Sequence, residues 1–342
     1  MRRHTTQILC SLVANLVQFS NTHSPVLPNV VGIELLNEPR PSSDEELQEW
    51  YAATIKELRH IDGSNIPIYM GDCWRIDAYA GFISKLGRVS GLVALDHHLY
   101  RCFTDSDIHA SANDHARALR DRMPDVFSRV AEKLGRAHGG LVVGEWSAAL
   151  NPRSIRGEAE EVKNYVSAQL ELYERHCAGW WFWTYKKQRR PDAGWCLLDA
   201  VDAGVFPPRV GMTATKWPCG DEERREDVKE AEGRQAYGGY AVLSIGLKLK
   251  LSDGHVAYWT QYPGRYEHER FAGGFSDGWD DGYQFLLSGV HAGRVSELGF
   301  VLARARGRVS GASGTYWEYE HGYVQGARAA RHDFVQTFCA DL

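Results

Sequence analysis

Short apolar runs alternate with longer amphipathic segments through the first half of the chain. The runs lie at residues 30–36, 66–70, 91–99, 141–144 and 179–186. Apolar runs of this length, bounded by turn residues, are typical of strands buried in a parallel sheet. Between them, apolar residues recur at intervals of three and four in the segments 44–58, 112–134 and 155–176, which predicts helices. The alternation predicts an α/β fold built on a parallel sheet.

Two of these segments show how the helices are expected to begin. Ser43 is followed three residues later by Glu46, a capping-box pattern that marks a helix start. Residues 7–19 predict a further helix before the first strand, with one apolar face made of Ile8, Leu9, Leu12, Val13, Leu16 and Val17. The start of this segment imitates a secretory signal, but polar residues interrupt it with helical periodicity and no small-residue cleavage site follows. We therefore interpret it as an amphipathic helix and expect no signal peptide in this chain.

Two of the predicted strands end on a glutamate. The run 30–36 leads into Asn37, Glu38 and a proline, and the run 141–144 leads into Glu145. Paired carboxylates at the C-terminal ends of parallel strands are typical of glycoside hydrolysis, in which one protonates the leaving oxygen and the other attacks the anomeric carbon or activates water. A glutamate at a strand end is often only the first residue of a solvated loop, so neither glutamate indicates catalysis by itself.

The residues near the other strand ends strengthen the interpretation. His98 and Tyr100 are two positions apart on the third predicted strand, so they point to the same side of the sheet. Trp183 stands in the aromatic run at 179–186, where it would serve to stack on a sugar ring or simply to fill a core. A structural or metal-binding role was the alternative for the pair His97 and His98, but no Cys or His has zinc-ligand spacing around them. We therefore expect no metal at the site.

Taken together, these motifs resemble glycoside hydrolase family 5, and most closely the fungal exo-β-1,3-glucanases. The resemblance places Glu38 after the fourth barrel strand and Glu145 after the seventh. It implies that Glu38 is the acid/base, Glu145 the nucleophile, and Asn37 a hydrogen-bond partner of the nucleophile or of the sugar 2-hydroxyl group.

The same resemblance places His98 and Tyr100 on the sixth strand, beside the nucleophile, and makes Trp183 on the eighth the platform for the sugar. A β-glucan or oligosaccharide is the implied substrate, and no cofactor is implied.

The implied fold is an α/β fold of the (β/α)8 TIM-barrel type, truncated to about its last five β/α units, with a C-terminal, mainly helical extension. A closed barrel needs eight units, so three would be missing from the front. Of two explanations, a gene model that begins too late and a real fragment that has lost activity, we favour the first. We expect a partial barrel at 1–218, a charged linker or insert at 219–257, and a helical extension at 258–342.

The expected extension carries a weak internal repeat. An aromatic residue followed three positions later by glycine occurs twice in 271–278 and twice again in 319–326. Aromatic residues and glycines at this spacing lie on one helical face, where they permit close helix contact. We interpret the repeat as close packing of two helices rather than as a sugar-binding module.

Composition narrows the remaining function classes. The 342 residues carry a formal net charge of −5 and no basic stripe, so we expect no nucleic-acid partner. No window approaches the roughly 18 continuous apolar residues of a membrane span. Seven cysteines without regular spacing argue against a complete disulfide framework. The family that the motifs resemble is usually extracellular or in the cell wall, and the sequence leaves both localisation and oligomeric state open.

The sequence thus predicts hydrolysis of β-glucosidic bonds, β-1,3 in the first instance, by a retaining mechanism that uses two glutamates. A β-1,4-glucan or mannan hydrolase is one alternative, because strand-end residues determine the chemistry while loops determine the sugar. An inactive or vestigial glycan-binding protein is the other.

Overall fold

The chain divides into two compact units, residues 1–208 and 209–342, which are described separately. The computed structural model describes residues 2–22, 30–63, 66–87, 90–137, 139–157, 159–207, 229–230, 242–288, 296–308 and 314–338. Of the segment expected to be a charged linker or insert, 219–257, residues 219–228 and 231–241 lie outside the described residues, and 242–257 belong to a helix.

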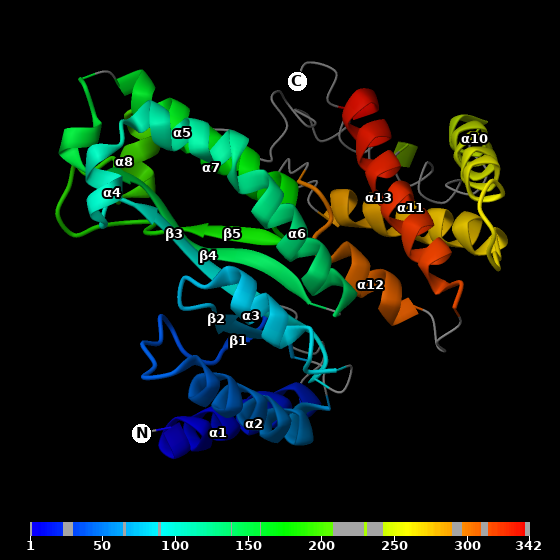
Figure 1. Cartoon of the computed structure of the whole chain (residues 1–342), viewed down its shortest axis with the longest axis horizontal. Helices are drawn as coiled ribbons and strands as arrows, with labels where there is room; N and C mark the ends of the chain where they lie inside the picture. Colours follow the sequence, from blue (N-terminus) through cyan, green and yellow to red (C-terminus); the bar gives the residue numbers. More distant parts are fainter. Residues whose placement is uncertain are drawn as a thin grey trace. The chain divides into compact units, whose positions relative to one another are not determined.

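The first unit is built on a sheet of five parallel strands in the order β1-β2-β3-β4-β5 (Figure 1). The strands are β1 (Ile33–Glu34), β2 (Ile68–Gly71), β3 (Val93–Arg101), β4 (Gly140–Leu150) and β5 (Gly179–Phe182). Each new strand joins the sheet beside the preceding one, as strands do in a barrel. The predicted α/β fold is confirmed as a half-barrel, with five strands where a closed barrel has eight.

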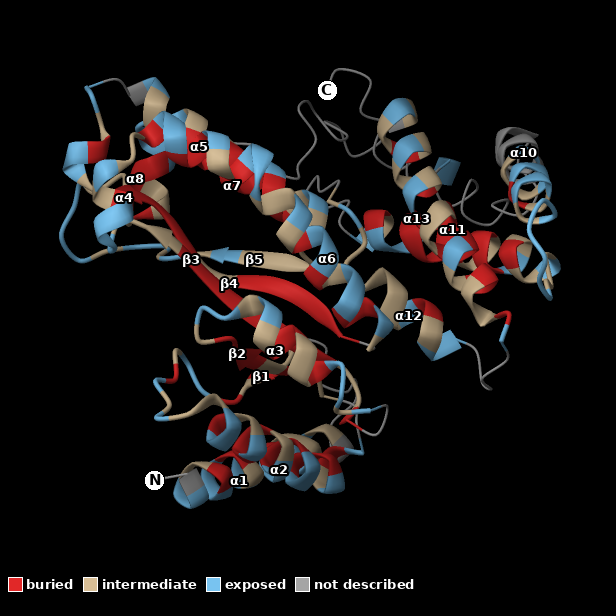
Figure 2. Ribbon diagram, viewed as in Figure 1, coloured by how far each residue is buried: buried red, intermediate tan, exposed pale blue. Residues whose placement is uncertain are grey.

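Helices connect the strands. They are α1 (Arg2–Thr22), α2 (Asp44–Asp62), α3 (Ile76–Ile83), α4 (Asp105–His109), α5 (Ala112–Asp121), α6 (Met123–Arg136), α7 (Ala159–His176) and α8 (Leu197–Asp202), with a short 3-10 turn at Pro152–Ser154. Helix α3 packs on β3, α6 on β4, and α7 on β4 and β5. Figure 2 shows β3 and β4 as mostly buried. The helical layer and the sheet therefore enclose the core.

Helix α2 begins where its capping pattern predicts. The Ser43 hydroxyl accepts a hydrogen bond from the backbone N–H of Glu46 at 3.1 Å, which satisfies one of the donors left free at a helix start. The helix ends at Gly63, whose φ of 62° is the left-handed conformation that closes many helices. The apolar positions predicted for this helix are all buried: Leu47, Trp50, Tyr51, Ile55 and Leu58.

Two helical predictions differ from the structure in detail. The segment 112–134 forms two helices, α5 and α6, which meet at Arg122, because Pro124 in the first turn of α6 cannot continue the preceding helix. Helix α1 forms as predicted, but its buried face differs. Leu9 and Val13 are buried, whereas Ile8 and Leu12 are 54% and 45% exposed.

A polar contact accounts for the orientation of α1. The Thr6 hydroxyl accepts a hydrogen bond from the Trp50 indole N–H at 2.9 Å and lies 3.0 Å from the Thr54 hydroxyl. Thr6 therefore faces α2, and this turns Ile8 and Leu12 toward solvent.

The described part of the second unit consists mainly of helices α10 (Val242–Trp259), α11 (Glu269–Ser288), α12 (Val301–Arg308) and α13 (Tyr316–Phe338). Helices α11 and α13 lie side by side (Figure 1). Glycines face the partner backbone from both sides. A Cβ atom on Gly278 would lie 2.0 Å from the Tyr323 carbonyl oxygen, and one on Gly326 would lie 2.0 Å from that of Phe275. The repeated aromatic and glycine pattern thus produces a backbone-to-backbone helix contact.

No helix among the described residues combines the length and the apolar character needed to cross a bilayer.

Candidate active site

Strand β3 supplies side chains to both faces of the sheet. Asp96, His98 and Tyr100 alternate with residues of the opposite face, as the pleat of a strand requires. On that opposite face His97 Nδ1 lies 2.6 Å from Asp72 Oδ2, in a buried pair. His98 therefore belongs to the candidate site, whereas His97 has a structural partner.

Glu38 follows β1 and faces His98. Its Oε1 lies 2.8 Å from His98 Nδ1. The backbone of Glu38 has a φ of 41°, in the left-handed region that residues with a Cβ rarely adopt. Cys73 and Trp74, after β2, also have positive φ values of 51° and 59°. Strained backbone of this kind gathers at functional sites, where surrounding contacts hold it.

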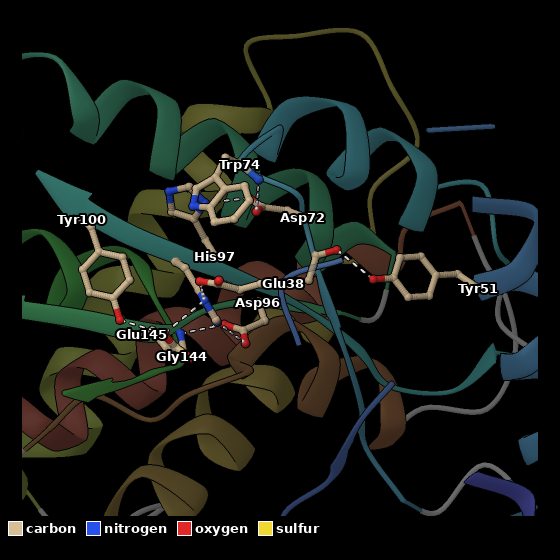
Figure 3. Close-up of polar contacts among 11 residues, drawn as sticks. Glu38, Tyr51, Asp72, Trp74, Asp96, His97, Tyr100, Gly144 and Glu145 are labelled. Atoms are coloured by element: carbon tan, nitrogen blue, oxygen red, sulfur yellow. Dashed lines mark hydrogen bonds and ion pairs between the residues drawn. The ribbon is translucent and has the colours of Figure 1, made fainter. Parts of the chain in front are cut away.

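Glu145 lies on β4, next to β3. Tyr100 donates its hydroxyl hydrogen bond to Glu145 Oε2 at 2.7 Å, and His98 Nδ1 lies 3.6 Å from the same oxygen (Figure 3). One oxygen of Glu38, one of Glu145 and a ring nitrogen of His98 all lie within 4.8 Å of one another. The structure thus brings four of the six predicted site residues together: Glu38, His98, Tyr100 and Glu145.

The sequence interpretation missed Asp96, which joins β3 to β4 behind this group. Its Oδ1 accepts a hydrogen bond from the Gly144 backbone N–H at 2.6 Å, and its Oδ2 lies 3.2 Å from His98 Nε2. A Cβ atom on residue 144 would come within 2.3 Å of both carboxylate oxygens of Asp96. Gly144 is therefore required by the close approach of Asp96. In the sequence, Asp96 could have been noticed only because it stands two positions before His98 and therefore lies on the same face of the strand.

Glu34, on β1, was missed as well. Its Oε1 is buried and has no hydrogen-bond partner among the described residues. Burial, with the charge of Asp96 second, raises the pKa of Glu34 to about 7. A carboxyl group with such a pKa retains its proton in weakly acidic solution, so it lies beside Asp96 without a second full negative charge.

His98 is polarised from both sides. Burial by itself lowers the pKa of an imidazole, but hydrogen bonds to Asp96 and Glu38 and the charge of Glu145 outweigh it and raise the pKa of His98 to about 9. At neutral pH the ring is therefore a cation that contacts Asp96 through Nε2 and Glu38 through Nδ1.

The two remaining predicted residues stand apart from this group. Asn37 is exposed, and within the described ranges its side chain has no hydrogen bond to Glu38 or Glu145. Trp183 follows the end of β5 and is 51% exposed, with no ring contact to a described aromatic residue. An exposed indole at a strand end is free to stack on a ligand.

The site borders a small, shallow hollow. Its lining consists of Glu38, Gly71, Asp72, Cys73, Trp74, Asp96 and His98. On the other side of Glu145, the rings of Tyr100, Phe103 and Trp195 lie within 6 Å of one another, centre to centre. Carboxylates between aromatic surfaces are an arrangement suited to a sugar.

Comparison with known proteins gives a consistent relationship. Residues 246–336 match the family model described as the glucan 1,3-beta-glucosidase 3 C-terminal domain. Glucan 1,3-beta-glucosidase 3 of Schizosaccharomyces pombe is 26% identical over 90% of this chain and 59% of its own length. An uncharacterized glycosyl hydrolase of Saccharomyces cerevisiae is 23% identical over 87% of this chain and 54% of its own. Glucan 1,3-beta-glucosidase of Lachancea kluyveri is 29% identical over 57% and 51%.

The chain is thus a relative of fungal glucan 1,3-β-glucosidases, which confirms the resemblance inferred from the motifs. It spans between 51% and 59% of the length of these three relatives.

Proposed function

We propose that this chain carries the site of a β-glucan hydrolase that acts with retention at the anomeric carbon. The observation that carries the proposal is the approach of the Glu38 and Glu145 carboxylates, whose nearest oxygens lie within 4.8 Å of each other and of His98 Nδ1. Retaining glycosidases hold their carboxyl groups about 5–5.5 Å apart, whereas inverting enzymes leave about 6.5–9.5 Å for a water molecule. The close approach favours retention.

Glu145 is the proposed nucleophile. The Tyr100 hydroxyl donates to its Oε2, and the cationic His98 ring lies 3.6 Å from the same atom, so both contacts hold the carboxyl group in place. An oxygen of Glu145 attacks the anomeric carbon and forms a glycosyl ester while the glycosidic carbon–oxygen bond breaks.

Glu38 is the proposed acid and base. A proton shared between His98 Nδ1 and Glu38 Oε1, 2.8 Å apart, is available to the leaving oxygen. In the second step the Glu38 carboxylate removes a proton from water, whose oxygen attacks the anomeric carbon and releases Glu145. Asp96 holds His98 Nε2 throughout, which leaves Nδ1 directed at Glu38.

A β-1,3-glucan is the substrate that we propose first, because two of the relatives described above are named glucan 1,3-β-glucosidases. Trp183 is the proposed platform for the sugar ring, and Asn37 the proposed partner of the 2-hydroxyl group once substrate is bound. With such a substrate, the site of action is the cell wall or the extracellular space. A β-1,4-glucan or mannan remains the alternative within the same chemistry.

A specific observation favours a second candidate, a glycan-binding protein without turnover. The described sheet has five strands and is not closed on itself; Glu145 lies on strand β4 and Glu38 follows strand β1. An open site admits water and weakens the electrostatic effects on which the reaction depends. A binding protein would hold the sugar with the aromatic side chains of the site, and the two glutamates would take no part in a reaction.

The experiment that tests the proposal compares Glu145→Gln and Glu38→Gln with the unchanged chain on laminarin, cellulose and mannan. We expect hydrolysis of laminarin, release of the β-anomer as the first product seen by NMR, and a loss of turnover of about 10³-fold or more for Glu145→Gln. Glu49→Gln, an exposed glutamate on α2, is the matched control and should leave turnover unchanged. Binding of laminarin without hydrolysis, equal in all variants, would establish the non-catalytic alternative.

A further inference from the structure

The helical unit contains a second cluster of ionisable side chains, remote in sequence from the candidate active site. His255 lies on α10, His268 immediately precedes α11, and Glu318 lies on α13. His255 Nε2 is 2.9 Å and His268 Nδ1 is 2.8 Å from Glu318 Oε2. Three segments, separated by up to 63 positions in the chain, therefore direct three donor atoms at one point.

The carboxylate at the centre of this cluster is fully buried. The Glu318 side chain is 0% exposed and that of His255 is 1% exposed. A buried carboxylate is strongly disfavoured unless a cation or a set of hydrogen bonds compensates for its lost hydration. Its second oxygen, Oε1, accepts a hydrogen bond from the Glu267 backbone N–H at 2.6 Å, which fixes the orientation of the group. Oε2 is thus presented to the two imidazoles.

We propose that His255 Nε2, His268 Nδ1 and Glu318 Oε2 form a binding site for a divalent transition metal ion of the zinc type. These three atoms lie within 4.8 Å of one another, and two imidazole nitrogens with one carboxylate oxygen are a donor set that such ions prefer. Magnesium and calcium favour all-oxygen sites and fit this set poorly. An ion held at ligand distances of about 2.0–2.2 Å requires the three donor atoms to move only slightly apart.

The surroundings hold the proposed ligands in place. The His255 ring stacks on Phe271 with centres 4.3 Å apart, and the His268 ring stacks on Tyr266 with centres 5.3 Å apart. The His268 side chain is 23% exposed, so the cluster reaches solvent on the side of this residue. These stacking contacts restrict the orientation of both imidazole rings.

A bound ion would connect α10, the start of α11 and α13. Metal binding to a site formed only in the folded state adds its binding free energy to the stability of that state. Spacing rules for zinc ligands do not reveal such a site, because they rely on ligand pairs close in sequence, whereas these three residues come from three separate segments of the chain.

The test is a zinc titration of the full chain after treatment with a chelator, followed by calorimetry and by thermal unfolding. We expect one equivalent of zinc to bind, to raise the Tm, and to be replaceable by cobalt(II) with a visible absorption band typical of nitrogen and oxygen ligation. Glu318→Gln keeps the shape of the side chain, and His268→Ala alters a partly exposed residue whose loss the fold tolerates better. Each should weaken zinc binding by more than about 100-fold, because even outer-shell partners contribute 10–100-fold.

Exposed histidines also bind zinc weakly, so the control is His332→Ala, an exposed position on α13. This variant should bind zinc as the unchanged chain does. If the unchanged chain bound no zinc tightly, the proposal would be overturned. The two imidazoles would then be only hydrogen-bond partners of Glu318. Equal binding by His268→Ala would overturn it as well, because the ion would then occupy another place.

Discussion

Asp96 connects residues that the sequence alone presents as separate. Its carboxylate accepts a hydrogen bond from the Gly144 N–H and contacts His98 Nε2, so Asp96 has partners on two sides. Glu34 lies close enough for the Asp96 charge to raise its pKa, and its buried Oε1 has no partner in the described ranges. Glu34 is therefore the group expected to hold a proton in weakly acidic solution.

This arrangement makes the stability of the chain depend on Glu34 in a defined pH range. The pKa of Glu34 is raised from 4.5 to about 7 in the folded state, so folding favours the protonated form. Its contribution is fully present below about pH 4.5 and is lost as the pH rises toward 7. Glu34→Gln cannot ionise at this position. We expect the free energy of unfolding of this variant to change with pH by about 1–2 kcal/mol less than that of the unchanged chain, after allowance for the partial exposure of Glu34.

Urea unfolding at intervals between pH 4.5 and 6.5 measures the effect of Glu34→Gln. Below pH 6.5 His98 is protonated in the folded state, because its pKa there is about 9. His98 therefore contributes little to the change of unfolding free energy with pH in this range. Glu49→Gln, at an exposed position on α2, serves as the control and should follow the unchanged chain. Parallel curves for Glu34→Gln and the unchanged chain would contradict a proton held on Glu34.

At the scale of single elements, local sequence signals predicted well what local interactions control. Ser43 and the buried face of α2 could be predicted because capping and helical periodicity act within a few residues. The orientation of α1 could not, because it depends on the Thr6 contact with Trp50 on another helix. The break at Arg122 was readable from Pro124, whose effect on a helix is local.

The candidate site shows the same limit. The proximity of Glu38, His98, Tyr100 and Glu145 could be predicted because strand ends of a parallel sheet meet at one edge. Asp96 and Glu34 could not be identified from the sequence, since their environment arises from contacts between strands that are distant in the chain. The unusual backbone of Glu38 is also invisible in the sequence, because a positive φ in a residue other than glycine is imposed by its surroundings.

The α11–α13 pair provides a prediction at this scale. A methyl group on Gly278 would lie 2.0 Å from the Tyr323 carbonyl oxygen, so the two helices would have to move apart. We expect Gly278→Ala to destabilise the helical unit by about 2–3 kcal/mol, the usual cost of overpacking. Gly273→Ala on the same helix adds the same methyl group where nothing lies within 4 Å, and should stabilise by up to about 1 kcal/mol through helix propensity.

Hydrogen exchange across α11 and α13, combined with thermal unfolding, measures both glycine variants. Equal effects of Gly278→Ala and Gly273→Ala would mean that the close backbone contact does not hold in solution.

At the scale of the whole chain, each of the two compact units contains buried aromatic residues of its own. In the helical unit one buried cluster consists of Phe275, Trp279, Tyr283, Leu286, Ala330 and Phe334. In the sheet unit Trp146 packs against Tyr173, Trp180 and Phe182. The change from alternating strands and helices to helices alone could be seen in the sequence. The limits of the compact units, with a division after residue 208, rest on contacts between elements, which the sequence does not show.

Two compact units, each with buried aromatic residues of its own, predict independent responses to substitution. Gly144→Ala would place a methyl group within 2.3 Å of both Asp96 carboxylate oxygens, and should destabilise the sheet unit by about 2–3 kcal/mol. Peptides from residues 1–208 should then exchange faster, while those from α11 and α13 keep their protection; Gly278→Ala should give the reverse. In the double variant the two effects should add within about 0.5 kcal/mol, as they do for sites without shared neighbours. A larger coupling, or loss of protection in both units from either single change, would show that the two units unfold as one.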